Sequence, residues 1–310
     1  MTGRAKITIV GAGNVGASVA QWSAAKELGD IVLVDIIEGL PEGKALDLWE
    51  SGPIAGFDLK IVGSQGYEAT IGSDIVIVTS GVARKPGMSR EDLIDVNRKI
   101  VESVVREVVR RSPDCTLVVV TNPLDTMVYL ALRVSGFAKN RVIGQAGVLD
   151  SSRFRSFVAE ELGVSVEDTQ ALVLGGHGDE MVPLPRYCTV SGIPITQLLS
   201  CEKIETIIDR TVNAGGEIVK LLKTGSAFVS PGAAVAEMAE AIIKDKKRVI
   251  PCSAYLEGEY GLRDIYFGVP VKLGAGGVEQ VIEVELTEDE RRLMERSAAR
   301  VRQSISSLRL

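Results

Sequence analysis

The first half of this 310-residue chain alternates short apolar stretches with longer segments of helical periodicity. The short stretches are rich in β-branched residues and almost entirely apolar, as expected of strands that are buried on both faces. The expected strands span 6–10, 31–35, 74–79, 116–121 and 141–143, and the expected helices span 15–28, 42–50, 92–111 and 124–135. Strands and helices that alternate in this way predict a doubly wound α/β fold with a parallel sheet.

The second half of the chain has a different pattern, which begins after Gly147 with an expected helix from Asp150. Further helices are expected at 204–222 and 233–243 and from Thr287, and strands at 171–174, 185–190, 249–256 and 266–273. This mixture predicts an α+β domain. We expect two closely packed domains, 1–146 and 147–310, because no linker-like or repetitive tract separates them.

A glycine-rich segment follows the first expected strand and opens the first expected helix. It consists of Gly11, Ala12, Gly13, Asn14, Val15 and Gly16. The first glycine permits a tight turn, the second lets the backbone approach a pyrophosphate, and the third lets the helix pack on the strand. Asp35 ends the second expected strand, where a carboxylate binds ribose hydroxyls and repels a 2′-phosphate. This Rossmann-type pattern predicts NAD as the cofactor. The alternative interpretation is a glycine turn that binds no ligand. Flavin enzymes and some methyltransferases share the fold, so the fold alone does not define the chemistry.

The chain contains a single histidine, His177, within the glycine-rich stretch 175–179. Imidazole is the side chain whose ordinary pKa lets it take and return a proton near neutral pH. Any imidazole-based acid/base catalysis must therefore use this residue. The structural alternative is a glycine-rich turn that happens to contain a histidine.

Two arginines, Arg84 and Arg90, flank Pro86 and Gly87 in a loop that follows a buried strand. Ligands of doubly wound sheets bind at the carboxyl ends of the strands, so this loop is a candidate to close over a bound anion. A solvated basic loop is the alternative interpretation.

Three more polar residues are candidates for the same site. Asp150 and Arg153 lie three positions apart at the start of an expected helix, so an aspartate that orients an imidazole can adjoin an arginine that grips a carboxylate. The alternative is an N-cap with a surface companion. Asn122 ends a strand and precedes Pro123, where it offers an amide to a ligand or forms a simple turn.

Charge and cysteine content exclude several classes of protein. The net charge of −6 gives no broad basic field, so we expect neither nucleic acid nor anionic lipid as a partner. The four cysteines form no CxxC pair, which predicts reduced thiols and no metal site. No apolar run approaches the length of a membrane span and no signal peptide is evident, so we expect a cytoplasmic protein.

Together these motifs resemble the NAD-dependent malate and lactate dehydrogenases, from Lys6 to about Val284. The matching segments are GAGNVG, LVDI, RKPGMSREDL, TNPLD, GVLDSSRFR, LGGHGD, MVPL, KTGSAF and GVPVKLG. The resemblance is strongest to the malate dehydrogenases built on the lactate dehydrogenase plan. It implies reversible oxidation of (S)-malate to oxaloacetate, with another 2-hydroxy acid such as L-lactate as the alternative substrate. A non-catalytic NAD-binding module is a more remote alternative.

The resemblance also implies a role for each candidate residue. His177 would take the proton of the substrate hydroxyl, Asp150 would orient the imidazole, and Arg90 would polarise the carbonyl of the keto acid. Arg153 would bind the carboxylate beside the reacting carbon. Arg84 would bind the second carboxylate, at a position where typical lactate dehydrogenases carry glutamine.

Further contacts follow from the same resemblance. Asn122 would contact both substrate and nicotinamide, and its bond to Pro123 is expected to be cis. Ser226 would line the substrate pocket. Additional cofactor contacts are expected from Asn97, Val120 and Thr121. The family forms dimers and tetramers, and apolar patterning at 42–50 and 233–243 likewise predicts a homodimer or homotetramer. The resemblance implies a small dicarboxylic 2-hydroxy or 2-keto acid as the substrate.

Overall fold

The computed structural model describes residues 3–83 and 88–308. In the first half of the described chain, six parallel strands are ordered β3-β2-β1-β4-β5-β6. They are β1 (Lys6–Val10), β2 (Asp30–Val34), β3 (Ile61–Ser64), β4 (Ile75–Val78), β5 (Thr116–Val119) and β6 (Val142–Gly144). The doubly wound fold is confirmed. The sequence analysis missed β3, an edge strand in which only the first residue is buried.

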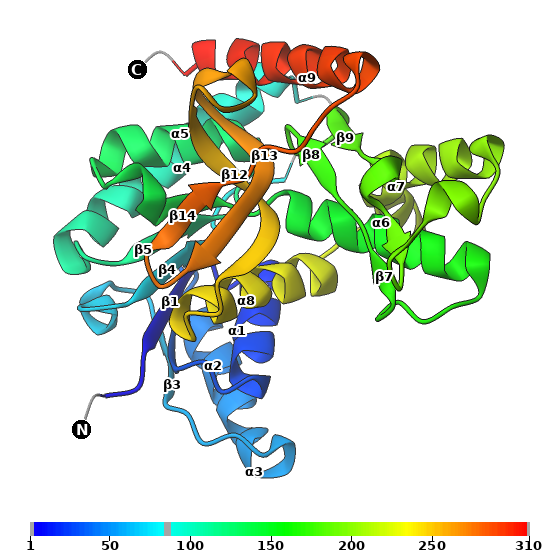
Figure 1. The fold of residues 1–310 in the computed structure, drawn as a ribbon. Coiled ribbons are helices and arrows are strands. Elements are labelled where there is room, and N and C mark those ends of the chain that lie inside the picture. Colours follow the sequence, from blue (N-terminus) through cyan, green and yellow to red (C-terminus); the bar gives the residue numbers. More distant parts are fainter. Residues whose placement is uncertain (1–2, 84–87, 309–310) are drawn as a thin grey trace.

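Helices cover both faces of this parallel sheet (Figure 1). They are α1 (Asn14–Ala25), α2 (Leu40–Glu50), α3 (Gly52–Ala55), α4 (Arg90–Arg111), α5 (Leu124–Ser135) and α8 (Val229–Ile243). Successive side chains of a strand point to opposite faces, so Ile7 and Ile9 enter the core formed with α1 and α8. Val10 enters the core formed with α4 and α5. Burial on both faces explains why these strands are apolar throughout.

In the second half of the chain, antiparallel strands extend the same sheet. The strands β12 (Arg248–Glu257) and β13 (Arg263–Gly274) form a long hairpin, and Ser253 of β12 pairs with Gly144 of β6. The remaining strands are β7 (Thr169–Gln170), β8 (Val173–Gly175), β9 (Met181–Pro183), β10 (Thr189–Val190), β11 (Ile193–Pro194) and β14 (Gly277–Val281). Because β8 pairs with β13, β8 belongs to the same sheet as the parallel strands, with β12 and β13 between it and β6.

Three further helices complete the second half: α6 (Gly147–Leu162), α7 (Cys201–Leu222) and α9 (Glu288–Ser306). Thr287, where the last helix was expected to start, is the N-cap of α9 and forms a capping box with Glu290. By contrast, α6 begins at Gly147, so Asp150 lies inside the first turn and the N-cap interpretation is wrong. Figure 1 shows α9 crossing the top of the molecule, above β8 and β9.

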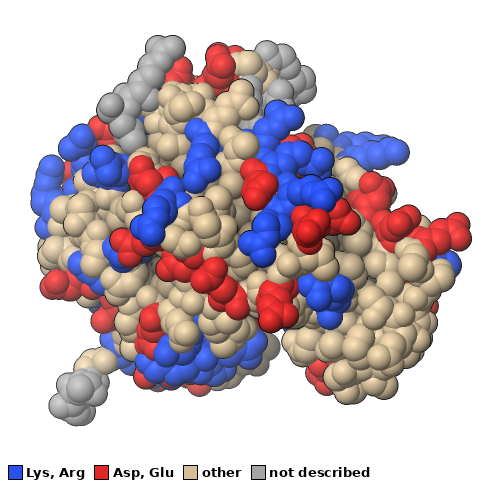
Figure 2. Space-filling model, turned by 45° about the horizontal axis from the view of Figure 1, so that its top comes forward, with Lys and Arg blue, Asp and Glu red and all other residues tan. Residues whose placement is uncertain are grey.

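On the face drawn in Figure 2, basic and acidic side chains are interspersed. None of the described helices has both the length and the apolar character required to cross a bilayer. All four cysteines are free, with Cys201 exposed and the other three buried. The described residues include no group of three or more His, Cys, Asp or Glu side chains that could hold a metal ion.

Candidate functional site

The glycine-rich loop forms a tight junction between β1 and α1. Gly11 has a φ of 106°, and a Cβ there would lie 2.6 Å from the backbone nitrogen of Ser80. A Cβ at Gly16 would lie 1.9 Å from the carbonyl oxygen of Gly11, so only glycine lets the helix approach the strand this closely. Gly13 has open space around it and is the N-cap of α1 without a side-chain cap. The first amides of α1 are therefore available to an anion such as a pyrophosphate.

Asp35 lies directly after β2, beside this loop. Its Oδ2 accepts a hydrogen bond of 2.7 Å from the backbone N–H of Ala12, and its Oδ1 accepts one of 3.1 Å from the backbone N–H of Ile37. Each oxygen retains acceptor capacity, because a carboxylate oxygen offers two lone-pair sites. The carboxylate and the open glycine loop therefore fit the ribose and the pyrophosphate of NAD.

Asn97 of α4 joins the two loops that follow β4 and β5. It is fully buried; its Oδ1 accepts from the backbone N–H of Val82, and its Nδ2 donates to the carbonyls of Val82 and Asn122. Thr121 donates to the carbonyl of Ser80 at 2.6 Å. Asn97 thus clamps the segment that leads toward Arg84. The peptide bond between Asn122 and Pro123 is cis, as expected.

The residues His177, Asp150 and Arg153 form a chain of polar contacts, which we call the histidine cluster. The ring Nδ1 of His177 lies 2.9 Å from Oδ2 of Asp150, and Nη1 of Arg153 donates to Oδ1 of Asp150 at 3.3 Å. Asp150 is only 2% exposed, and its position in the first turn of α6 aims it at the loop after β8. No described residue forms a hydrogen bond with Nε2 of the imidazole, so this nitrogen is free to exchange a proton.

The environment of His177 favours its protonated form. Burial lowers the pKa of the imidazole, but the charge of Asp150 and its hydrogen bond raise it, Asp125 adds to the increase, and Arg153 opposes it. The net effect raises the pKa of His177 above its ordinary value of 6.5. A histidine held in this way can donate a proton to a keto acid and recover it from a hydroxy acid.

A cavity of about 250 Å³ opens beside the histidine cluster. His177 and Asn122 line it together with Asp179, Glu180 and Arg300. The structure therefore brings the carboxyl end of β5 and the loop after β8 to the same cleft, although 55 positions separate Asn122 from His177 in the sequence. Ligands of doubly wound sheets bind in this region, outside the carboxyl ends of the strands.

Other predicted site residues are not brought into this cluster. Arg84 lies outside the described residues. Arg90 is the first residue of α4, whose N-cap is Ser89 with a capping box to Asp92, but its side chain is not described. Ser226 is exposed in the segment between α7 and α8 and does not line the cavity. Their assigned contacts therefore remain predictions.

Sequence reasoning missed Asp125, a buried carboxylate beside His177. Asp125 is 5% exposed, and its Oδ2 accepts a hydrogen bond of 2.9 Å from the backbone N–H of His177. A signal was present, because Asp125 is the one charged residue among the first nine of α5, which are otherwise apolar apart from Thr126 and Tyr129. Sequence reasoning also assigned no role to the C-terminal helix, which supplies Arg300, Val301 and Ser304 to the cavity wall.

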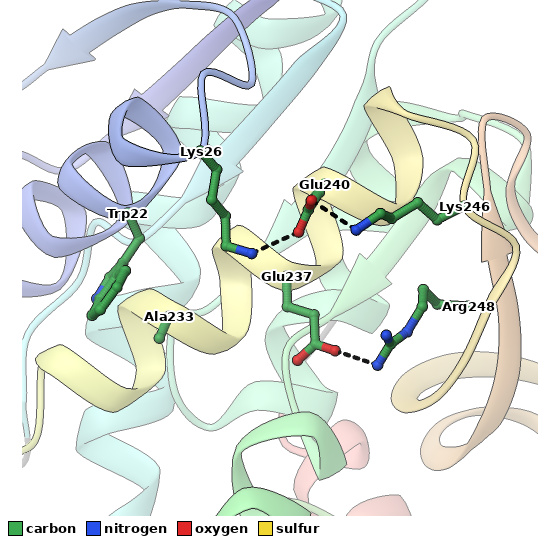
Figure 3. Close-up of a pocket in the computed structure, with 7 residues that line it drawn as sticks. All are labelled: Trp22, Lys26, Ala233, Glu237, Glu240, Lys246 and Arg248. Atoms are coloured by element: carbon green, nitrogen blue, oxygen red, sulfur yellow. Dashed lines mark hydrogen bonds and ion pairs between the residues drawn. The ribbon is translucent and has the colours of Figure 1, made fainter. Parts of the chain in front are cut away.

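A second cavity, of about 350 Å³, lies between α1 and α8 (Figure 3). Its lining includes Glu240, Glu237, Lys26, Lys246 and Arg248, which we call the α1–α8 cluster. Each of these charges contacts an opposite charge: Lys26 and Lys246 reach Glu240 at 2.6 and 2.7 Å, and Arg248 reaches Glu237 at 2.7 Å. This cavity therefore has no unpaired charge to offer a ligand.

The cofactor loop and the histidine cluster lie along the same edge of the parallel sheet, at the carboxyl ends of its strands. A loop that fits a dinucleotide next to an imidazole oriented by a carboxylate defines a class, the NAD-dependent oxidoreductases that transfer a hydride together with a proton.

Comparison with known proteins identifies the particular family. Residues 5–144 match the model of the lactate/malate dehydrogenase NAD-binding domain, and residues 147–309 match that of the lactate/malate dehydrogenase α/β C-terminal domain. The chain is 62% identical over 306 residues to malate dehydrogenase from Roseiflexus sp. (strain RS-1), covering 99% of both chains.

Solved structures agree with the family models. Malate dehydrogenase from Salinibacter ruber is 55% identical, with a TM-score of 0.95 and coverage of 98% of this chain and 97% of that one. Lactate dehydrogenase from Cryptosporidium parvum, solved with lactic acid and β-nicotinamide adenine dinucleotide, is 42% identical, with a TM-score of 0.96 and coverage of 99% of both. The chain belongs to the lactate/malate dehydrogenase family, and NAD is its cofactor.

Proposed function

We propose that this chain is a malate dehydrogenase that catalyses the reversible oxidation of (S)-malate to oxaloacetate by NAD. The observation that carries the proposal is the 2.9 Å contact between His177 Nδ1 and Asp150 beside the cleft, with no described residue hydrogen-bonded to Nε2. Relatives that match the chain at 58 to 62% identity over 99% of its length are named malate dehydrogenase, which supports the same substrate.

In the proposed reaction, His177 accepts the hydroxyl proton of malate at Nε2 while the hydrogen on the same carbon leaves with its electron pair. NAD, when bound, supplies the hydride acceptor at its nicotinamide ring. Asp150 stabilises the imidazolium that results, and Arg153 binds the carboxylate next to the reacting carbon. In the reverse direction the imidazolium returns its proton to the carbonyl oxygen, so reduction of oxaloacetate requires the protonated histidine.

The remaining roles rest on the family resemblance. Arg90 polarises the carbonyl, Asn122 contacts both substrate and nicotinamide, and Ser226 lines the substrate pocket. Asn97, Val120 and Thr121 add contacts to the cofactor. We propose that the chain divides functionally at the predicted boundary, with cofactor binding in residues 1–146 and substrate binding in residues 147–310.

Arg84 is the residue that we propose selects oxaloacetate over pyruvate. A guanidinium pairs well with the second carboxylate of oxaloacetate and is costly to bury against the methyl group of pyruvate. Lactate dehydrogenase is the competing function, because the lactate dehydrogenase of Cryptosporidium parvum shares the fold.

Steady-state oxidation of NADH with oxaloacetate and with pyruvate tests this proposal. We expect the wild-type chain to prefer oxaloacetate in kcat/KM by about a thousandfold or more. Arg84→Gln should reduce that preference by at least about a hundredfold, and Lys85→Gln, which removes a neighbouring positive charge, should leave it unchanged. A wild-type preference for pyruvate would refute the assignment, and an unaltered preference in Arg84→Gln would remove Arg84 from this role.

We further propose that the protein is a cytoplasmic homodimer or homotetramer. The surfaces of α2 and α3 expose Leu46, Trp49 and Ile54, which are 54%, 56% and 92% accessible. Large apolar side chains gathered on neighbouring elements favour a protein contact. Four free cysteines, three of them buried, are consistent with a reducing compartment.

A further inference from the structure

Asp125 joins three separate segments of the chain beneath His177. Its Oδ2 accepts from the backbone N–H of His177 at 2.9 Å, and its Oδ1 accepts from the hydroxyl of Ser253 at 2.6 Å. The three residues lie on α5, in the loop after β8 and on β12, respectively. Both carboxylate oxygens are therefore used, and neither bond is local in sequence.

Asp125 is buried, and burying a carboxylate costs free energy. Burial raises the pKa of Asp125 above its ordinary value, and the hydrogen bonds from Ser253 and from the His177 backbone oppose this rise without cancelling it. Each of these bonds favours the ionised carboxylate. A neutral residue of similar size would fill the same space without the cost of burying a charge.

His177 is consequently held at two points by two acids. Asp150 contacts the ring at Nδ1, and Asp125 contacts the backbone nitrogen of the same residue. The adjacent backbone N–H, that of Gly176, donates to Ser297 Oγ of α9 at 2.9 Å, an uncharged anchor of the same loop. The consecutive amides of Gly176 and His177 are thus held by a neutral and by a charged side chain, respectively. Mutating each in turn separates the effect of loop position from the effect of charge on His177.

The charged groups around His177 come from every neighbouring element. They are Asp150 and Arg153 of α6, Asp125 of α5, Asp179 and Glu180 of the following loop, and Arg300 of α9. Glu180 pairs with Arg300 at 3.5 Å, which offsets both charges. Asp150 is offset in part by Arg153. In the described part of the chain, Asp125 has no cationic side chain as partner apart from the imidazole when it is protonated.

We infer that Asp125 is a positioning residue for His177, which holds the histidine backbone with one oxygen and stabilises the imidazolium with its negative charge. The inference rests on the proposed function, because it assigns a purpose to the proton on His177. Protonated His177 is the form that reduces oxaloacetate. Asp125 would therefore extend the pH range of reduction upward by acting through His177.

The test uses the full-length chain and the variant Asp125→Asn. An asparagine amide can accept from the His177 backbone with its oxygen and donate to Ser253 with its nitrogen, so both contacts can persist while the charge is lost. Ser297→Ala is the matched control, since it removes an anchor from the same loop without changing any charge. Thermal melts first establish that both variants are folded.

The readout is an NMR titration of the imidazole in the protein without substrate. His177 is the only histidine, so its signal needs no assignment. We expect its pKa to fall by about one unit in Asp125→Asn and to stay at the wild-type value in Ser297→Ala. At pH values above the wild-type pKa, oxaloacetate reduction by Asp125→Asn should be about tenfold slower in kcat/KM, with the alkaline limb displaced to lower pH.

Two outcomes would overturn the inference. One is a folded Asp125→Asn whose histidine titrates at the wild-type pH. The other is an equal displacement in Asp125→Asn and Ser297→Ala, which would show that loop position alone matters. If Asp125→Asn fails to fold, Ser253→Ala replaces it in the titration. Loss of the Ser253 hydroxyl removes a hydrogen bond that favours the ionised form of Asp125, so we expect the pKa of His177 to fall by less than in Asp125→Asn. An unchanged pKa of His177 would refute the inference.

The titration does not depend on catalysis, which separates this inference from the proposed function. A wild-type chain that ignores oxaloacetate refutes the function, whereas an unmoved imidazole titration refutes only the role of Asp125.

Discussion

The histidine cluster and the α1–α8 cluster both bring acids and bases together from distant parts of the chain, but they differ in how completely the charges are paired. In the α1–α8 cluster, Glu240 receives Lys26 and Lys246 at 2.6 and 2.7 Å (Figure 3). In the histidine cluster, Arg153 contacts a single acid among the described residues, Asp150, at a longer distance of 3.3 Å. Its buried Nε has no hydrogen-bond partner among the same residues.

This difference indicates what each cluster does. Opposite charges that satisfy one another have little left to offer a ligand, and removing one of them leaves its partner unpaired, which destabilises the fold. A buried guanidinium with an unused donor is costly by itself and favourable once a carboxylate binds it. We therefore expect mutations in the histidine cluster to change activity and mutations in the α1–α8 cluster to change stability.

The largest effect is expected from His177→Asn. Asparagine cannot exchange a proton near neutral pH, so turnover with oxaloacetate should fall by about two to four orders of magnitude. The pH dependence of kcat in the two directions should disappear with the imidazole. Steady-state kinetics measure the loss, and retention of NADH binding by fluorescence shows that the cofactor loop is intact. Near wild-type turnover in this variant would contradict the proton-transfer role.

A smaller effect is expected from Arg153→Lys. Lysine keeps the charge next to Asp150 but cannot form the planar two-pronged contact with a carboxylate. The kcat/KM for oxaloacetate should fall by about ten- to a hundredfold, mainly through KM.

Arg155→Lys is the matched control on the same helix. Arg155 donates to the backbone carbonyls of Thr169 and Val166. These two residues do not line the cleft. That variant should keep wild-type kinetics. Equal kinetic losses in the two variants would mean that Arg153 acts through the fold rather than on the substrate.

The smallest effect is expected from Glu240→Gln, and it should appear in stability alone. The hydrogen bonds from Lys246 and Lys26 lower the pKa of Glu240 from 4.5 to about 2. A shift of that size corresponds to at most about 3 kcal/mol, and because the lysines are partly exposed we expect about 1–2 kcal/mol of lost unfolding free energy at pH 7. Urea unfolding measures this loss, and kcat/KM should not change.

The pH dependence of the same variant provides a second check. The pKa of Glu240 is lower in the folded state than in the unfolded state. Its contribution to the free energy of unfolding is therefore fully present above pH 4.5 and is lost as the pH falls toward 2. The stability difference between wild type and Glu240→Gln should therefore vanish over this range. Glu288→Gln, which removes the same charge from an exposed pair with Arg292, should leave the melting curve unchanged. A constant difference down to pH 2 would contradict the pairing argument.

Much of the fold was predictable because its signals are local. The strand β1 begins and ends where expected, and the last helix begins within one residue of its expected start at Thr287. The short edge strand β3 was not predictable, since only its first residue is buried and it lacks an apolar pattern. The start of α6 was misjudged by three residues because Gly147 gives no capping signal; close packing against Pro251 and Val173 accompanies the start there.

The candidate site was predictable only in part. His177, Asp150 and Arg153 were identified from residue type and motif, and the structure brings them into contact. Asp125 was overlooked because acids are common near the start of a helix, where the helix dipole favours a negative charge. Its contacts with the loop after β8 and with β12 became evident only from the tertiary structure.

By itself, the sequence determined the class of fold and the cofactor, because a strand, a glycine turn and a helix N-terminus form from residues that are adjacent in the chain. The tertiary structure decided which charges meet. Asp125 and His177 are 52 residues apart, and Lys26 and Glu240 are 214 apart. Electrostatic interactions depend on distance and on burial, and neither quantity exists for such pairs until the helices have packed against the sheet.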